Sequence, residues 1–152
     1  MIAIQDLFES HLTVSDLDRA IEFYRDALRL PLASVIPERR VAFFWVGARG
    51  KAMLGVWETG KGPQKMTHHV AFRVDGNDLE AVPQSLRAAG IAPLDFHGRP
   101  AEEPVVLTWM PAAAVYFRDP DGNLLEFLAM LPGEARPELG VLPLSSWRAI
   151  SA

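Results

Sequence analysis

Hydrophobic and polar residues alternate along several short segments of the chain, which is the pattern of half-buried strands. The segments that show it are residues 11–14, 32–36, 41–46, 52–58, 69–74, 92–96, 115–118 and 124–130. Successive side chains of a strand face opposite sides of a sheet, so each segment can turn one apolar face to a core. The run Asp119-Pro120-Asp121-Gly122 is expected to join the last two strands as a type I turn.

Apolar residues that recur every three to four positions predict two helices. The first helix carries Leu17, Ile21, Tyr24 and Leu28 on one face. Ser15 is its expected N-cap, and Pro31 follows its end. The second helix is expected to begin at Asp78 and to close with Gly90 as its C′ residue, with Pro83 kinking it or delaying its start.

The order of these elements repeats along the chain with a period near 58 (69 − 11), because His11 and His69 open the two copies. Each copy is expected to fold as strand, helix and three strands. The pattern therefore predicts an α+β fold with a first βαβββ module over residues 1–66 and a second over residues 67–131. The proline-rich tail, residues 132–152, is expected to be irregular, with room for a short helix near its end.

Composition narrows the classes of protein that fit this pattern. The chain is 49% hydrophobic and 22% charged, with a net charge of −4 and no basic block, so a nucleic-acid partner is not expected. It contains no cysteine, so any metal must bind to histidine and carboxylate groups. No run approaches the ~18 apolar residues of a membrane helix, and residues 1–6 lack the positive region of a secretory signal. A cytoplasmic protein that acts on a small molecule, without nucleic acid or membrane, is the expectation.

Strand parity brings three residues that can bind a metal to comparable places in the repeat. His11, His69 and Glu126 each point away from the apolar face of their own strand. Their separations are nearly equal, at 58 and 57 residues (69 − 11 and 126 − 69). Two imidazoles and one carboxylate leave coordination positions open for water or substrate, as a catalytic metal site requires.

Simpler roles exist for each of these residues. A single histidine on a half-buried strand is more often a hydrogen-bonded structural residue than a ligand. Glu126 lies among leucine and phenylalanine, so its carboxylate needs either a metal or an ion pair, for which Arg73 and Arg118 are candidates.

Other polar and aromatic residues carry weaker signals. Thr13 shares a face with His11 and is expected to line the cavity, whereas His68 has the opposite parity and is expected in the core or behind the site. Glu58 ends a strand, where a carboxylate that faces solvent is the simpler interpretation. Four aromatic residues could wall an apolar pocket, although core packing explains at least half of them: Trp57, Trp109, Phe44 and Tyr116.

Residues 11–28, 69–74 and 115–127 together resemble the vicinal oxygen chelate superfamily over roughly residues 7–130. This superfamily includes glyoxalase I, fosfomycin-resistance enzymes, bleomycin-resistance proteins and extradiol dioxygenases. The resemblance implies paired βαβββ modules in a U-shaped, curved mixed sheet with helices on its outer face. It also implies a divalent metal (Zn, Ni, Mn or Fe) held by His11, His69 and Glu126, with Glu126 and Thr13 as the catalytic residues, and usually a homodimer.

The chain departs from one member of this superfamily at a ligand. Glyoxalase I takes a fourth, carboxylate ligand from the last strand of its first module, and residues 53–56 offer none here. Weak or no activity on the methylglyoxal–glutathione adduct is therefore expected, unless Glu58 is the fourth ligand. The resemblance favours a metal-dependent lyase or transferase acting on a small substrate with vicinal oxygens, with or without a thiol. A ligand-binding protein without catalysis, like the bleomycin-resistance proteins, and a small ring-cleaving dioxygenase are the alternatives, and the site could lie within one chain or be shared between two.

Overall fold

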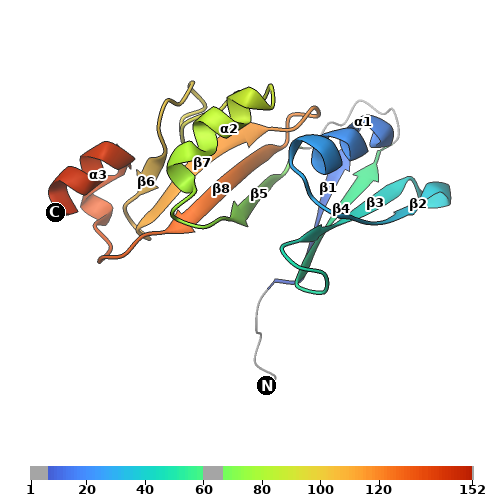
Figure 1. Cartoon of the computed structure of the whole chain (residues 1–152), viewed down its shortest axis with the longest axis horizontal. Helices are drawn as coiled ribbons and strands as arrows, with labels where there is room; N and C mark the ends of the chain where they lie inside the picture. Colours follow the sequence, from blue (N-terminus) through green and yellow to red (C-terminus); the bar gives the residue numbers. More distant parts are fainter. Residues whose placement is uncertain (1–6, 60–66, 152) are drawn as a thin grey trace, which may run out of the picture. The chain divides into compact units, whose positions relative to one another are not determined.

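The computed structural model describes residues 7–59 and 67–151, which separate into two compact units, each with one sheet (Figure 1). Unit 1 is the chain up to His68 together with Asp119–Asn123, and unit 2 is His69–Arg118 together with the chain from Leu124 onward. The predicted boundary between modules, after residue 66, falls in the stretch 60–66, which lies outside the described residues. The division into modules at that point stays a prediction.

Unit 1 holds a four-stranded sheet in the order β1-β4-β3-β2, in which β1 is parallel to β4 and the other pairs are antiparallel. Its elements are β1 (Glu9–Val14), α1 (Leu17–Glu22), the π-helical turn η1 (Phe23–Ala27), β2 (Leu32–Ile36), the 3₁₀ turn η2 (Pro37–Arg39), β3 (Val41–Val46) and β4 (Ala52–Glu58). The last three strands have the bounds that the alternation predicts, and β3 and β4 contain buried residues, whereas β2 has none.

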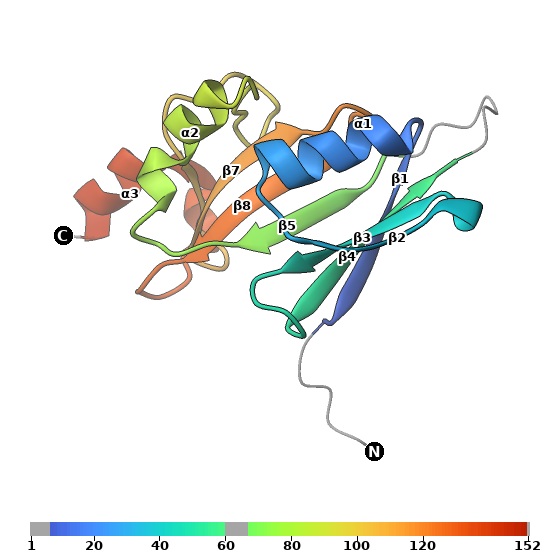
Figure 2. The same ribbon diagram turned by 45° about the vertical axis from the view of Figure 1, so that its right-hand side comes forward.

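The core of unit 1 lies between its sheet and α1, which covers one face of β3 and β4 (Figures 1 and 2). The fully buried side chains include Leu12, Leu54, Val56 and Phe44 from the strands and Leu17, Ala20 and Tyr24 from the helical segment. The rings of Tyr24 and Phe44 lie 5.6 Å apart. Each large apolar side chain buried in this way stabilises the fold by about 1.5–3 kcal/mol, which fixes which face of the sheet is turned away from the core.

The start of α1 differs by one residue from the prediction. Asp16 is the N-cap, and its side chain accepts a hydrogen bond from the backbone N–H of Arg19 at 3.0 Å. Ser15 instead bonds to a distant residue: its backbone N–H donates to Oδ1 of Asp121 at 2.9 Å, and its hydroxyl donates to the same oxygen. The expectation that Ser15 is the cap was wrong, because local pattern cannot show an acceptor 106 positions away.

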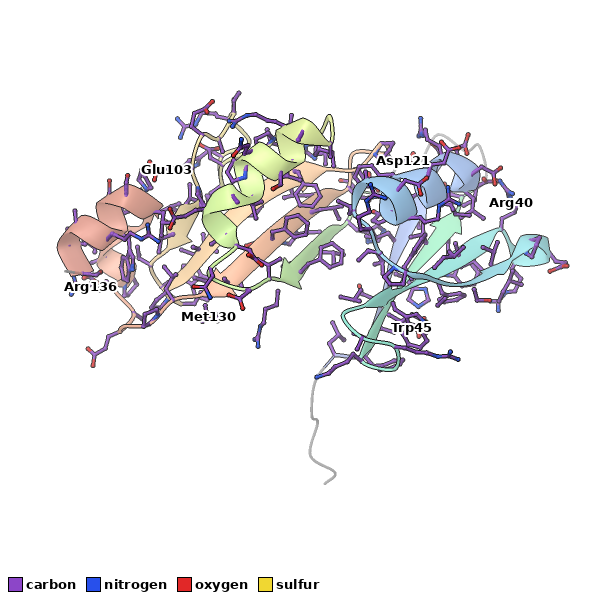
Figure 3. All side chains as sticks on the ribbon, in the orientation of Figure 1. Arg40, Trp45, Glu103, Asp121, Met130 and Arg136 are labelled. Carbon is purple, nitrogen blue, oxygen red and sulfur yellow. The ribbon has the colours of Figure 1, made fainter. Side chains whose placement is uncertain are left out.

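The turn Asp119–Asn123 belongs to unit 1 by its contacts, although it follows a strand of unit 2 in sequence. The Tyr24 hydroxyl donates to Oδ2 of Asp119 at 2.9 Å, inside the core. The Asn123 side chain donates to the carbonyl of Thr13 at 3.2 Å and accepts from the backbone N–H of His68 at 2.9 Å. Asp121 lies beside the start of α1 (Figure 3). These hydrogen bonds pair most of the buried polar groups of the turn, as a stable core requires, although Oδ2 of Asp121 has no partner among the described residues.

Unit 2 holds a five-stranded sheet in the order β5-β8-β7-β6-β9, in which only β5 and β8 are parallel. Its elements are β5 (His69–Arg73), the 3₁₀ turn η3 (Leu79–Ala81), α2 (Val82–Ala88), β6 (Val105–Leu107), β7 (Ala112–Arg118), β8 (Leu124–Met130), the 3₁₀ turn η4 (Pro137–Leu139), β9 (Val141–Pro143) and α3 (Leu144–Ser151). Pro83 delays the start of α2, as predicted, because it occupies the first turn where its missing N–H costs nothing. The predicted turn between β7 and β8 is confirmed by the hydrogen bond from Gly122 N–H to the Asp119 carbonyl at 3.0 Å.

Two segments of unit 2 differ from the prediction. Residues 92–96 were expected to be a strand, but they make only isolated bridges through Leu94, to Pro100 and to Tyr116. The tail was expected to be irregular apart from a short helix near its end. The helix is α3, but β9 was not expected, and it extends the sheet by pairing with β6. The alternation was too short to reveal β6 and β9, because three-residue strands fall below the length that a period of two can mark.

The predicted α+β class is confirmed by these two mixed sheets and their few helices. None of the helices in the described ranges is long and apolar enough to cross a membrane. In each unit one face of the sheet packs against helical residues. The opposite faces carry the candidate ligands.

Candidate metal site

The face of the unit 1 sheet that is turned away from α1 carries His11. We call it the His11 face and define it by Glu9, His11 and Thr13 of β1, Met53, Gly55 and Trp57 of β4, and Phe43 and Trp45 of β3. Trp45 extends from β3 on this side (Figure 3). The parity predicted for His11 and Thr13 is therefore confirmed, since Leu12 and Val14 are buried on the helix side. The cavity-lining and catalytic role of Thr13 stays a prediction.

Both ring nitrogens of His11 are engaged by side chains of the same face. The indole N–H of Trp57 donates to Nδ1 at 2.5 Å, and Nε2 lies 2.6 Å from Oε1 of Glu9. An indole N–H can only donate, so Nδ1 carries no proton in this arrangement. The proton of the neutral ring is then on Nε2, where it is donated to Glu9.

The equivalent face of unit 2 carries His69 and Glu126. Nδ1 of His69 lies 3.1 Å from the carbonyl oxygen of Leu124, and Nε2 lies 3.1 Å from Oε2 of Glu126. A carbonyl oxygen can only accept, so the proton of the neutral ring is on Nδ1. Nε2 therefore turns its lone pair towards a carboxylate oxygen. Two acceptor atoms at this distance are stable only with a cation or a proton between them.

Glu126 is the one acidic residue of β8, and it is only 4% exposed. Burial raises the pKa of Glu126, while the charge of His69 and hydrogen bonding to Tyr116 and His69 act in the opposite direction. Burial and the nearby charge of Glu126 raise the pKa of Tyr116. By strict hydrogen-bond geometry, the buried Oε1 atom of Glu126 has no partner in the part of the chain that the structure describes. An unsatisfied buried carboxylate oxygen costs free energy unless a ligand completes it.

The His69–Glu126 pair fits a divalent metal. Histidine ligands usually donate their second ring N–H to a backbone carbonyl or a carboxylate, as His69 does to Leu124. Metal bonds of about 2.0–2.2 Å place neighbouring donors about 3 Å apart, close to the 3.1 Å between Nε2 and Oε2. Within either unit, the described residues contain no group of three or more His, Asp and Glu side chains suited to hold a metal. The set of His11, His69 and Glu126 spans the two units and stays a prediction.

Glu58 is occupied elsewhere. Its Oε2 accepts from the backbone N–H of Leu17 at 2.7 Å and from Arg40 at 2.6 Å, and its Oε1 accepts from Arg40 at 3.0 Å. It pairs in register with Val14, so it lies on the helix side of the sheet. Glu58 is neither a simple solvent-facing carboxylate nor a group of the His11 face.

Of the other residues that the sequence singled out, some lie beside His11 or His69 and some do not. Trp57 contacts His11, and the rings of Tyr116 and His69 lie 6.2 Å apart. Phe44 is in the unit 1 core, and Trp109 is 60% exposed. His68 has a buried Nε2 atom without a partner in the described ranges, in keeping with a position away from the His69 face.

Glu9 is the residue of this site that sequence reasoning missed. It shares the parity of His11 two positions earlier on the same strand, and that signal could have found it.

Comparisons with known proteins show which family and which fold the chain shares. A family model described as "Glyoxalase/Bleomycin resistance protein/Dioxygenase superfamily" matches residues 5–127. A metallothiol transferase FosB of Shouchella clausii is 28% identical over 120 residues, which cover 77% of this chain and 76% of that protein. A lactoylglutathione lyase of Haemophilus influenzae is 30% identical over 131 residues, which cover 80% of this chain and 90% of that protein. Both of these relatives are enzymes by name.

Solved structures show the same fold. An integron cassette protein from the mobile metagenome of the Halifax Harbour sewage outfall matches with a TM-score of 0.72 and 31% identity, covering 84% of this chain and all (100%) of that chain. A lactoylglutathione lyase of Agrobacterium tumefaciens matches with a TM-score of 0.63 and 24% identity, covering 84% of this chain and 95% of that chain. The second likeness supports the fold alone.

Proposed function

The chain belongs to the glyoxalase, bleomycin resistance protein and dioxygenase superfamily, and on that premise we propose that it is a metal-dependent lyase or transferase. The proposed substrate is a small molecule with vicinal oxygens, used with or without a thiol. The proposed metal ligands are His11, His69 and Glu126. The observation that carries the proposal is the 3.1 Å approach of His69 Nε2 to Oε2 of Glu126, with Nδ1 of His69 held by the Leu124 carbonyl.

The residues of the chain support this chemistry in three ways. The Leu124 carbonyl fixes the ring of His69 so that Nε2 is presented for binding. Oε1 of Glu126 has no hydrogen-bond partner among the described residues, so one buried acceptor is left for a ligand or a substrate proton. A divalent ion bound there would act as a Lewis acid on a substrate oxygen. Tyr116 walls the site beside His69.

Elemental analysis of the purified protein tests the metal. We expect about one divalent ion per chain, because the ligand set describes a single open site. His69→Ala should remove most of it, whereas His97→Ala, an exposed histidine of the same unit, should retain it. His68→Ala should also retain it. Full occupancy in His69→Ala would overturn the metal assignment, and metal-free wild-type protein that still binds small apolar ligands would favour a binding protein.

Two assays then test the reaction class. The metal-reloaded protein is offered the methylglyoxal–glutathione adduct in one, and a thiol with a phosphonate-bearing oxirane in the other. These match the activities in the names of the two relatives and the sequence resemblance. Turnover in either, lost in His69→Ala, supports the proposal. Ring cleavage of a catechol with Fe(II) and oxygen, without turnover in these assays, would favour the dioxygenase alternative.

We also propose a homodimer. Each sheet has edge strands with unpaired backbone groups, β1 and β2 in unit 1 and β5 and β9 in unit 2, and such edges are covered in soluble proteins. Light scattering should give about 33.6 kDa (2 × 16.8 kDa). A stable mass of 16.8 kDa at micromolar concentration would contradict it.

A further inference from the structure

Register shows which residue of unit 1 stands where Glu126 stands in unit 2. On β5 the residue two positions after His69 is Ala71, and its partner on β8 is Glu126. On β1 the residue two positions after His11 is Thr13, and its partner on β4 is Trp57. Trp57 therefore occupies the position of the ligand carboxylate. Its indole N–H is a donor and cannot bind a metal.

The neighbouring position on this face, Gly55, has no side chain and is crowded by the His11 ring. It is the register partner of His11. A Cβ atom at position 55 would lie 3.0 Å from Nδ1 of His11 and 3.2 Å from the ring of Phe43. The His11 ring thus fills the space above Gly55, and β4 offers no carboxylate on the His11 face.

Glu9 is a carboxylate on that face, and it comes from β1 itself. Residues two apart on a strand share a side of the sheet, and Oε1 of Glu9 approaches Nε2 of His11 to 2.6 Å. The equivalent position of unit 2, two before His69, is Thr67, which has no carboxylate. Each unit therefore has one histidine with one carboxylate at Nε2, but the acid comes from a different strand in each.

We propose that Glu9 is a ligand of the metal bound by His11, and that it replaces the carboxylate of the last strand, where Trp57 stands. This inference rests on the proposed function. The two donor atoms, 2.6 Å apart without a metal, need to separate only to the roughly 3 Å of neighbouring ligands. The metal would then have two histidine and two carboxylate ligands, and a six-coordinate ion would keep two positions for a bidentate substrate.

Binding through Nε2 changes the hydrogen bonds of His11. The proton that Nε2 shares with Glu9 must move to Nδ1, and the Trp57 N–H must then leave Nδ1, because two donors cannot face each other. Weak or no activity on the methylglyoxal–glutathione adduct was expected because residues 53–56 offer no carboxylate ligand. If Glu9 is a ligand, that reason no longer holds.

The variant Glu9→Gln tests the inference in the full chain, with Glu38→Gln, an exposed acid of the same unit, as the matched control. The affinity for Zn(II) is measured by competition with a chromophoric chelator, and the visible absorption of the Co(II)-loaded protein is recorded at saturation. Loss of an outer-shell partner weakens metal binding by about 10- to 100-fold, so loss of a direct ligand should weaken it by about 100-fold. The Co(II) spectrum should change, because it depends on the number and kind of ligands.

The outcomes separate the two proposals. A loss of at least about tenfold in Glu9→Gln with a changed Co(II) spectrum, and neither in Glu38→Gln, supports Glu9 as a ligand. A smaller loss, or an unchanged spectrum at saturation, overturns it, because Glu9 then acts at most through His11. His69→Ala is measured beside them. If it still binds metal, the proposed function fails, whatever Glu9 does. Circular dichroism of the metal-free variants shows that each retains its fold.

Discussion

The two units present the same pair of groups, a histidine and a carboxylate, but they hold the histidine in opposite protonation patterns. In unit 2 a backbone carbonyl keeps a proton of His69 on Nδ1, and Nε2 faces Oε2 of Glu126. In unit 1 the Trp57 indole keeps the proton of His11 on Nε2, against Glu9. A repeat can therefore preserve the position of a ligand while neighbouring side chains decide whether it is ready to bind. For the proposed metal, His69 of unit 2 already has its proton on Nδ1, whereas His11 of unit 1 would have to change its tautomer.

The largest loss of metal affinity is expected when the His69–Glu126 pair of unit 2 is disrupted. Glu126→Gln should weaken Zn(II) binding by more than 100-fold, roughly, and by more than Glu9→Gln, because Glu126 is buried and its Oε1 atom has no other described partner. Competition with a chelator measures both variants. Glu102→Gln, a surface acid of unit 2, is the control and should bind as the wild type does. If Glu126→Gln and Glu102→Gln lose the same amount of Zn(II) affinity, the buried Glu126 has no special role in binding the metal.

Moving the acid back to β4 should make the two units alike. In the Glu9→Gln background, Trp57→Glu places a carboxylate at the register position of Glu126. We expect it to restore metal affinity by about tenfold. Trp57→Gln in the same background supplies the comparison without charge and should restore nothing. If the two double variants bind the metal equally well, a carboxylate at position 57 is not equivalent to Glu126, and the comparison by register fails.

A third difference concerns the turn Asp119–Asn123, which by sequence belongs with unit 2 but is part of unit 1. Burial alone would raise the pKa of Asp121, but hydrogen bonds from Ser15 and the charge of Arg19 outweigh it and hold that pKa below its usual range. A carboxyl with a lowered folded-state pKa stabilises the fold above its unfolded pKa of about 3.9, and this stability is lost as the pH falls through the folded value.

Asp121→Asn should therefore cost about 1–2 kcal/mol at pH 7. The difference from wild type should shrink as the pH falls below about 4. Denaturant unfolding at several pH values measures it. Asp78→Asn, at an exposed site, should stay within about 0.5 kcal/mol of wild type. A loss in Asp121→Asn that does not depend on pH would mean that shape, rather than charge, holds the turn.

The smallest effect is expected when the restraint on His11 is removed. Trp57→Phe keeps an aromatic ring beside His11 and deletes the N–H that holds Nδ1. A hydrogen bond contributes about 1 kcal/mol, so metal binding should tighten by about fivefold. Trp109→Phe, an exposed indole, should leave the affinity unchanged. Weaker binding in Trp57→Phe would show that the indole supports the ligand rather than restraining it.

The metal-site hypothesis came from parity, and the structure shows how far parity reaches. Alternation places His11, Thr13, His69 and Glu126 on the non-core faces, because each strand buries its opposite face. The same rule applied to Glu9 would have found an acid on the His11 face. Parity does not show which side chains are in contact. The sequence offered an arginine as the simpler partner of Glu126, but in the structure the carboxylate contacts His69.

The sequence by itself determined the α+β class, the bounds of most strands, and the delay of α2 at Pro83, because alternation and proline geometry act over a few neighbouring residues. Only the tertiary structure decided that Ser15 bonds to Asp121 while Asp16 caps α1, that Arg40 and the start of α1 bond to Glu58, and that β9 joins β6. Each of these depends on a partner many positions away. The proton positions on His11 and His69 belong to the same group, because a donor in one case and an acceptor in the other reach Nδ1 only after the strands have paired.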